Sequence, residues 1–265
     1  MNFQLNGRTA LVTGSSRGIG KAIAIALAKE GCHLYLCARN AEGLEKTCQE
    51  IRKVGHNAFY HCLDATNPKQ IKNFFDNFKD NLDILVNNIG GGTEKTNKLF
   101  EISEEDWLET YKLNVLSTMW FTQYALPFLE NSTQARIINI GSATSHQPGF
   151  NNPHYGAAKS ALDHLTKRLA NELAPKGICV NVIGPHALLG ETWERDVVNR
   201  AKIQNLSLEK ARETMTKEAL AKIPLGRQGT HEDVANLVVF LASSRANFIT
   251  GTYIPVDGGT FRAIP

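Results

Sequence analysis

The chain has 265 residues, a formal net charge of +3, 42% hydrophobic residues and 21% charged residues. This length and composition suit one large α/β domain with a full core, and they exclude a disordered chain. The sequence has no basic run for nucleic acid, no apolar stretch of the about 18 residues that span a membrane, and no metal-ligand spacing among its cysteines and histidines. We therefore expect a cytoplasmic protein with reduced thiols and without nucleic-acid, membrane or metal partners.

Short apolar runs alternate with helix-period segments along almost the whole chain. The predicted strands are Thr9–Thr13, Leu34–Ala38, Ala58–Leu63, Ile84–Val86, Ile137–Ile140, Cys179–Ile183 and Tyr253–Val256. Predicted helices include Ile19–Lys29, Glu42–Val54, a segment through Trp107–Leu129 that begins after a Ser103 cap, and Tyr155–Ala174. This alternation predicts an α/β fold of the Rossmann type, a doubly wound parallel sheet of about seven strands with helices on both faces.

No linker, internal repeat or low-complexity tract divides the chain, so we expect a single domain over residues 1–265. The one long interruption runs from about residue 186 to 226, between a strand and the last helix. Within it, Leu208–Lys222 is charged and helix-forming, which predicts a helical substrate lid rather than a disordered loop.

A glycine-rich motif, Thr13-Gly14-Ser15-Ser16-Arg17-Gly18-Ile19-Gly20, follows the first predicted strand and leads into a helix. Gly14 permits a tight turn, Gly18 lets the backbone approach a phosphate, and Gly20 lets the helix pack closely on the strand. The backbone N–H groups at the helix start would hold a pyrophosphate. Because a strand precedes the motif and a helix follows it, the motif indicates a dinucleotide-binding site. We expect this site to include Ser16, Arg17 and Ile19.

The end of the second predicted strand carries Arg39, where a protein that selects NAD tends to have an acid bonded to the ribose 2′-hydroxyl. Arg39 and Arg17 could instead make charge-assisted hydrogen bonds to a 2′-phosphate. The pattern therefore favours NADP(H) over NAD(H). The alternative is that either arginine is an ordinary surface residue.

Tyr155 and Lys159 are four residues apart in a predicted helix, so both side chains project from one face. A lysine cation about 4 Å from the phenol contributes on the order of 4 kcal/mol at an effective dielectric near 20, which would lower the tyrosine pKa by roughly three units. Such a tyrosine would serve as a general acid or base. Ser142, just past a predicted strand, could polarise a substrate carbonyl beside it.

These features resemble the short-chain dehydrogenase/reductase family over nearly the whole chain. The matching positions, in the family's order, are the glycine motif, Asn87-Asn88-Ile89-Gly90, Asn114, Ser142, Tyr155 and Lys159. Ile223-Pro224-Leu225-Gly226-Arg227 and Ile249-Thr250-Gly251 are most similar to the beta-ketoacyl (3-oxoacyl) reductase-like branch.

The resemblance implies a role for each matching residue. Ser142 would orient the carbonyl and Tyr155 would transfer the proton. Lys159 would bind the nicotinamide ribose and lower the tyrosine pKa, and Asn114 would hold a water that relays protons. The remaining positions would contact the cofactor: Asp64 at the adenine, and Asn88, Gly90 and Pro185 along the rest of it.

One departure from the family's pattern lies beside the expected nicotinamide site. After Pro185 the family has a glycine and then a threonine that reaches the carboxamide, whereas this chain has His186 and no threonine until Thr192. His186 therefore either faces the substrate or lies in a solvent-facing loop, and the cofactor role of Thr192 stays open.

The resemblance implies an NADP(H)-dependent reductase of a small-molecule carbonyl, with 3-oxoacyl thioesters among the candidate substrates. The alternatives are a dehydrogenase of a sugar, polyol or hydroxysteroid and a non-catalytic NADP(H) sensor, although a sensor would be expected to have lost Tyr155 or Lys159. Candidate pocket walls are Gly91–Thr93, His146, Gln147, Phe150, Leu188, Leu189 and Trp193. The segment Val256–Gly259 resembles a subunit contact, so a homotetramer is expected, with a dimer as the alternative.

Overall fold

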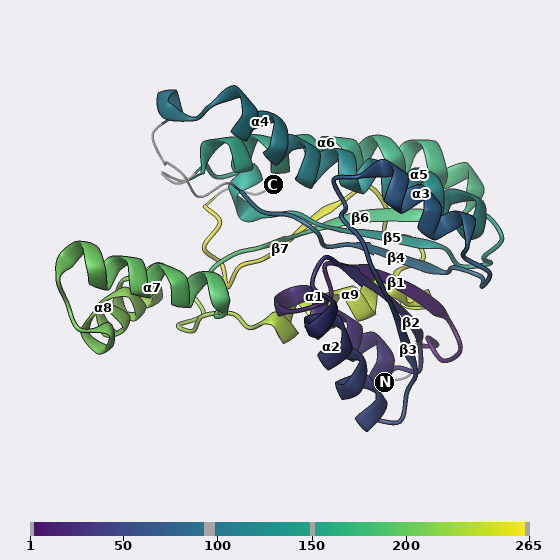
Figure 1. Ribbon diagram of the computed structural model, residues 1–265, viewed down its shortest axis with the longest axis horizontal. Helices are drawn as coiled ribbons and strands as arrows, with labels where there is room; N and C mark the ends of the chain where they lie inside the picture. The colour runs from purple at the N-terminus through teal and green to yellow at the C-terminus, as the bar shows by residue number, and fades with distance from the viewer. Residues whose placement is uncertain (1–2, 93–98, 149–151, 263–265) are drawn as a thin grey trace.

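The computed structural model describes residues 3–92, 99–148 and 152–262, and its centre is a single sheet of seven parallel strands (Figure 1). The strands are β1 Thr9–Thr13, β2 His33–Ala38, β3 Ala58–Cys62, β4 Ile84–Asn87, β5 Arg136–Ile140, β6 Cys179–Pro185 and β7 Tyr253–Val256. Their order across the sheet is β3-β2-β1-β4-β5-β6-β7. All seven predicted strands are confirmed, with ends shifted by one or two residues.

Helices cover both faces of the sheet, as a parallel sheet requires (Figure 1). One face carries α1 Gly18–Lys29, α2 Ala41–Lys53 and α9 His231–Ala242. The other carries α3 Pro68–Asp76, α4 Glu104–Tyr111, α5 Ser117–Leu129 and α6 Pro153–Leu173. This arrangement confirms the doubly wound Rossmann-type fold.

Two hydrophobic layers hold these helices against the sheet. Under α1 and α9, Ile23, Leu27 and Val238 pack with the strands and are fully buried. On the opposite face, Phe121 and Ile71 pack against the residues of β4 and β5 that alternate to that side. Fully burying an aliphatic or aromatic side chain contributes about 1.5–3 kcal/mol, so the two layers fix the sheet on which the site is built.

The helix predicted through Trp107–Leu129 is interrupted in the structure. A π-helical turn, Lys112–Leu116, separates α4 from α5. The predicted cap is present, because the backbone N–H of Asp106 donates to Ser103 Oγ at 3.2 Å. Hydrophobic periodicity could not distinguish a π turn from an α turn, since such a turn adds one residue and keeps the chain helical.

The predicted lid segment forms two helices, α7 Glu191–Gln204 and α8 Leu208–Leu220, which project from the body (Figure 1). They pack on each other through Trp193, Val197, Ala201 and Ala211. Trp193 thus packs within the lid rather than onto the body. The helical character is as expected, whereas the role of the segment as a substrate lid stays a prediction.

The strand order reverses direction at β1, because the chain passes first to β2 and β3 and then returns to β4 on the other side. Crevices at such a switch point, beyond the carboxyl ends of the strands, are where α/β sheets bind ligands. In the described ranges, no helix is long and apolar enough to cross a membrane, and no three potential metal ligands come together.

Candidate active site

The glycine turn after β1 has the backbone geometry that its sequence requires. Gly14 and Gly18 have φ angles of +67° and +57°, in the left-handed region that favours glycine. A Cβ at Gly20 would overlap the carbonyl of Gly14, so α1 approaches the turn more closely than any other residue would allow. The three glycines therefore form the tight turn and the close helix packing predicted for them.

The loop after β4 clamps this turn from the side. The Asn88 side chain donates to the carbonyls of Thr13 and Gly14 at 3.0 and 3.2 Å. In return, Thr13 Oγ1 accepts the backbone N–H groups of Asn88 and Ile89 at 2.9 and 3.2 Å. Asn88, which was predicted to line the cofactor, thus supports the glycine turn with its side chain, and Thr13 is a supporting residue that sequence reasoning missed.

The start of α1 fits the pyrophosphate of a dinucleotide. Its N-cap residue, Arg17, makes no side-chain cap hydrogen bond, and the first turn contains no acidic residue. The first N–H groups of a helix have no partner within the helix, and the helix dipole favours an anion there. Together with the turn at Gly14 and Gly18, these donors suit a phosphate group.

The residues predicted near the adenosine lie at the ends of β2 and β3. Arg39 is exposed, and among the described residues no acid forms an ion pair with it. Arg17 is also exposed but pairs with Glu191 in the first turn of α7. Exposed pairs of this kind contribute about 0–1 kcal/mol, so a phosphate could displace Glu191.

Asp64 accepts two hydrogen bonds from Thr66, each 2.9 Å long, so one of its oxygens is committed to the turn after β3.

Two catalytic candidates, Asn114 and Lys159, converge beside Gly90. A Cβ there would lie 2.7 Å from Asn114 Oδ1 and 2.8 Å from Lys159 Nζ, so only glycine leaves room for both groups. The Asn114 amide donates to the carbonyls of Gly91 and Thr110 at 2.7 and 2.8 Å, and its oxygen accepts from the Gly91 N–H at 3.1 Å. Asn114 lies in the π-helical turn, a feature frequent at functional sites.

Ser142 and Tyr155 face each other across the gap between β5 and α6. The Ser142 hydroxyl lowers the pKa of the Tyr155 phenol, so the two hydroxyl groups lie near each other. Ser142 caps a short 3-10 turn, Ala143–Ser145, and also accepts a hydrogen bond from Thr144 Oγ1 at 2.9 Å. Two hydroxyl groups side by side can both direct hydrogen bonds at one carbonyl oxygen, as expected for these residues.

Lys159 is almost fully buried, with 2% of its surface exposed. Its ammonium donates to the Ile140 carbonyl at 2.8 Å and lies 5.6 Å from the centre of the Tyr155 ring. Burial lowers the pKa of Lys159 to about 8, an effect that the Asp163 carboxylate opposes. The lysine can therefore exchange its proton at mildly alkaline pH.

The expected lowering of the Tyr155 pKa is wrong for this arrangement. Burial raises the pKa of Tyr155, the Ser142 hydroxyl lowers it, and the Asp163 charge raises it. Sequence reasoning assumed an ammonium about 4 Å from the phenol, whereas Lys159 turns toward the Ile140 carbonyl. The burial of both groups could not be read from their spacing, and it outweighs the predicted charge effect.

Other predicted residues lie at the edge of this group. Pro185 ends β6, His186 is exposed, and Thr192 is exposed in the first turn of α7. Of the candidate pocket walls, Leu188 packs on the core under α9, and Leu189 is 43% exposed. Thr93 and Phe150 lie outside the described residues.

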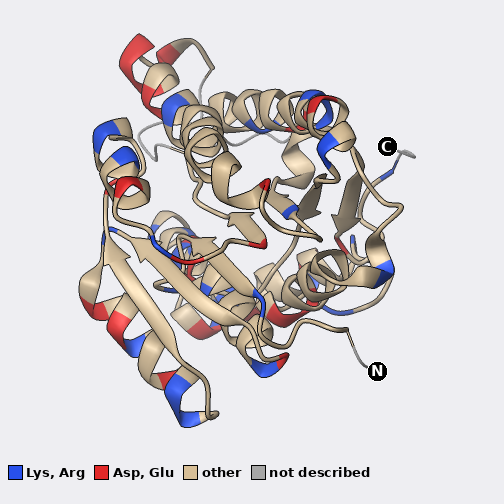
Figure 2. Cartoon of the chain, turned by 90° about the vertical axis from the view of Figure 1, so that its right-hand side faces the viewer, with Lys and Arg blue, Asp and Glu red and all other residues tan. Residues whose placement is uncertain are grey.

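The lid offers no concentrated positive surface. Arg200 on α7 makes two hydrogen bonds to Glu218 on α8, at 2.6 and 2.7 Å. Arg212 pairs with Glu194 in the same way between the two helices. On the side of the molecule away from these two helices, positive and negative residues are likewise interspersed (Figure 2). These pairs favour an ordinary solvated helix face.

Comparisons with known proteins identify the family of this chain. Over residues 14–260 the chain matches a family model described as enoyl-(acyl carrier protein) reductase. It is 35% identical to a 3-oxoacyl-[acyl-carrier-protein] reductase of Aquifex aeolicus, across 98% of this chain and 100% of that protein. It is 31% identical to a 7alpha-hydroxysteroid dehydrogenase of Escherichia coli (strain K12), across 97% of this chain and 96% of that protein.

Among solved structures, the chain is similar to an L-sorbose reductase from Gluconobacter frateurii complexed with NADPH and L-sorbose. The TM-score is 0.92 and the identity 30%, with 100% of both chains covered. Fold, site and matches together define an oxidoreductase that acts on CH–OH and carbonyl groups with a nucleotide cofactor. The chain belongs to the short-chain dehydrogenase/reductase family, near its 3-oxoacyl reductase branch.

Proposed function

We propose that this protein is an NADP(H)-dependent reductase that converts the carbonyl of a small molecule to an alcohol. The observation that carries the proposal is the convergence of Asn114 and Lys159 on Gly90, with the Ser142–Tyr155 hydroxyl pair on the adjoining turn and helix. All four residues stand at the carboxyl edge of the sheet, beside a glycine turn suited to a pyrophosphate.

The cofactor and the side chains of this protein would supply different parts of the reaction. NADPH, when bound, supplies the hydride. Ser142 and Tyr155 would then hold the substrate carbonyl oxygen by two hydrogen bonds, and Tyr155 would donate its hydroxyl proton to that oxygen as the alcohol forms. A raised pKa keeps Tyr155 protonated at neutral pH, which suits the acid in a reduction. Lys159, with a pKa of about 8, is suited to return a proton toward the tyrosine.

Selection of NADP(H) rests on Arg39 and Arg17 near the end of β2. A 2′-phosphate would meet the exposed Arg39 guanidinium, with no acid there to repel it, and could recruit Arg17 from Glu191. The NADPH complex of the similar L-sorbose reductase supports the same choice.

Two substrate classes have support. A 3-oxoacyl thioester is favoured by the similarity to a 3-oxoacyl-[acyl-carrier-protein] reductase. A keto-sugar is favoured by the likeness to L-sorbose reductase and by the lid, whose Arg200 and Arg212 are engaged by acids rather than available to an acidic carrier. Oxidation of a polyol or hydroxysteroid would use the same residues in reverse.

A homotetramer, with a dimer as the alternative, stays our expectation for the assembly. It is supported by exposed apolar side chains along α4 and the π turn, among them Leu108, Tyr111 and Leu116, which would be covered in an interface. Light scattering of the purified protein measures the mass directly.

The five cysteines are unpaired, in keeping with a reducing cytoplasm.

The experiment is a titration with NADPH and NADH, followed by NADPH consumption with a β-ketoacyl thioester, a diketone, a keto-sugar and a ketosteroid. We expect tighter binding of NADPH and turnover on one carbonyl class. NADH preferred over NADPH would refute the cofactor assignment. Absence of turnover in both directions, with the corresponding alcohols and NADP⁺ also tried, would refute the reductase.

A further inference from the structure

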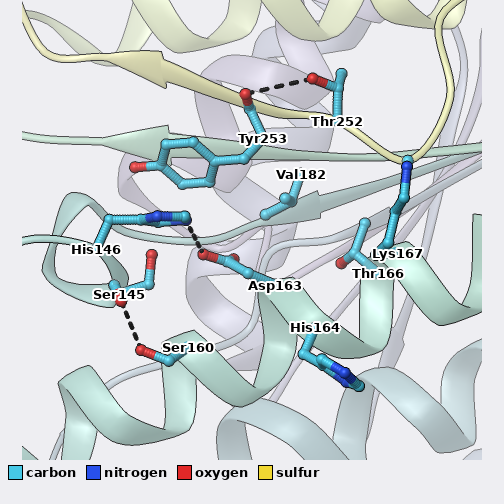
Figure 3. Close-up of a pocket in the computed structure, with 11 residues that line it drawn as sticks. Ser145, His146, Ser160, Asp163, His164, Thr166, Lys167, Val182, Thr252 and Tyr253 are labelled. Atoms are coloured by element: carbon cyan, nitrogen blue, oxygen red, sulfur yellow. Dashed lines mark hydrogen bonds and ion pairs between the residues drawn. The ribbon is translucent and has the colours of Figure 1, made fainter. Parts of the chain in front are cut away.

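Asp163 lies one helical turn beyond Lys159 on α6, so Tyr155, Lys159 and Asp163 follow one another at intervals of four residues along one stripe of the helix. Its side chain is only 11% exposed. It lines a cavity of about 290 Å³ between α6, β6 and the segment leading into β7 (Figure 3). A buried carboxylate is costly unless nearby groups stabilise its charge. The burial of the Asp163 carboxylate therefore indicates a role other than packing.

The turn that carries Ser142 holds Asp163 from the side opposite to the helix. His146, at the end of that turn, places Nε2 3.1 Å from Asp163 Oδ2 (Figure 3). The other carboxylate oxygen lies 3.1 Å from the position that a Cβ on Gly141 would take. Asp163 is thus enclosed between the catalytic helix and the turn of Ser142, at Gly141 before that serine and at His146 four residues after it.

Uncharged contacts fasten the same turn to the same helix. Ser160 Oγ on the helix donates to the Ser145 carbonyl at 2.6 Å (Figure 3). Within the turn, Ser145 Oγ donates to the Ser142 carbonyl at 2.7 Å. The Tyr253 ring packs on His146 with ring centres 4.2 Å apart. The turn would therefore retain its hydrogen bond with Ser160 of the helix and its packing on Tyr253 if the Asp163 charge were removed.

The charges around Asp163 come from three elements. In the described part of the chain, the titratable groups beside it are Tyr155, Lys159, His164 and Lys167 on α6, His146 on the turn and Tyr253 on β7. His164 and Lys167 point away from the carboxylate (Figure 3). Burial raises the pKa of Asp163, whereas the Ser145 hydroxyl and the charges of His146 and Lys159 lower it.

Lys159 is one of the groups that this carboxylate affects. It is buried, and the described residues provide it with no nearer negative charge than Asp163, whose charge opposes the loss of its proton. If Lys159 became neutral, it would no longer attract the tyrosine oxygen or a ribose hydroxyl as a cation. The negative charge one turn away thus extends the pH range over which Lys159 is an ammonium.

We propose that Asp163 is a positioning residue for the reaction: its charge keeps Lys159 in the ammonium form beside Tyr155, and His146 fixes it to the turn of Ser142. This inference rests on the proposed function, since it gives Lys159 its role toward cofactor and tyrosine. It adds a fifth residue, outside the Asn114, Ser142, Tyr155 and Lys159 group, whose role is exerted through Lys159.

The test is competitive acetylation with acetic anhydride across a pH series, with Lys159 read out by peptide mass spectrometry. The reagent acetylates only the neutral amine, so the midpoint of labelling follows the Lys159 proton without cofactor or substrate. We expect Asp163→Asn to move the midpoint to lower pH by about one unit, and Asp163→Glu to restore most of it. Asp163→Ser is a second neutral variant should Asp163→Asn fail to fold.

A matched variant separates charge from structure. Ser160→Ala removes a contact between turn and helix without changing any charge, and we expect it to keep the wild-type midpoint. At pH values above the shifted midpoint, Asp163→Asn should bind NADPH about tenfold more weakly than wild type. At pH values well below that midpoint, the two proteins should bind NADPH equally. An unchanged midpoint in a folded neutral variant would overturn the inference. Failure of the wild type to bind NADPH would instead count against the proposed function, and the acetylation result would still stand.

Discussion

Gly90→Ala changes the site by a single methyl group at the point where two catalytic candidates meet. The new Cβ would lie 2.7 Å from Asn114 Oδ1 and 2.8 Å from Lys159 Nζ, whereas ordinary contacts begin at 3.4 Å. Neither neighbour can yield freely, because Asn114 is hydrogen-bonded to Gly91 and Thr110, and Lys159 to Ile140. The lysine ammonium would have to leave its place beside the tyrosine.

Two magnitudes follow from this displacement. Overpacking of this kind costs about 1–3 kcal/mol of unfolding free energy, which for a chain of this size lowers Tm by roughly 2–10 °C. A misplacement approaching about 1 Å at a catalytic group costs on the order of 100-fold in rate. We therefore expect Gly90→Ala to be folded but to lose about two orders of magnitude in kcat.

The assay is NADPH oxidation with the best substrate of the carbonyl panel, together with thermal melting of the same samples. Gly91→Ala is the matched control, because its Cβ would meet only one neighbour within 4 Å, Leu113 Cδ2 at 3.9 Å. We expect that variant to keep most of its activity. Turnover of Gly90→Ala equal to that of Gly91→Ala would refute the crowded site described here.

The remaining predictions concern cofactor choice and the packing behind the site. Arg39→Asp should shift the NADPH/NADH preference about 10- to 100-fold toward NADH, because it replaces a charge-assisted hydrogen bond with repulsion; an unchanged ratio of binding constants would remove Arg39 from the 2′-phosphate site. Gly184→Ala should lower Tm by several degrees, because its Cβ would overlap the phenol of Tyr253. In a Tyr253→Leu background, Gly184→Ala should lower Tm by a smaller amount. An equal loss of Tm in both backgrounds would contradict that contact.

The fold could be predicted well from the sequence because both of its signals are local. Apolar runs such as Ile137–Ile140 mark strands buried on two faces, and periodic segments such as Ile19–Lys29 mark the helices between them. The π turn at Lys112–Leu116 and the helix Glu191–Gln204 were not distinguished. The first differs from an α-helix by one inserted residue, and the second buries only Val197 and Ala201, so its apolar stripe is weak.

The residues of the site could be predicted from the sequence, whereas their pKa shifts could not. The motifs gave the residues that meet at the carboxyl edge of the sheet. They could not give the direction of the Tyr155 pKa shift, which depends on how deeply the tyrosine and Lys159 are buried. Asp163 was missed because its partner His146 lies outside α6, in the turn after β5, and an acid on a helix ordinarily marks a solvated face.

The central claim is that Tyr155 gives its proton to a substrate carbonyl oxygen, and Tyr155→Phe tests it most directly. The measurement is the rate of NADPH oxidation by wild type and variant at saturating substrate, with NADPH affinity determined for both. We predict equal NADPH binding and a loss of about 10²- to 10⁴-fold in rate, because the variant removes only the hydroxyl. Turnover close to that of wild type in a variant that binds NADPH normally would contradict the assignment.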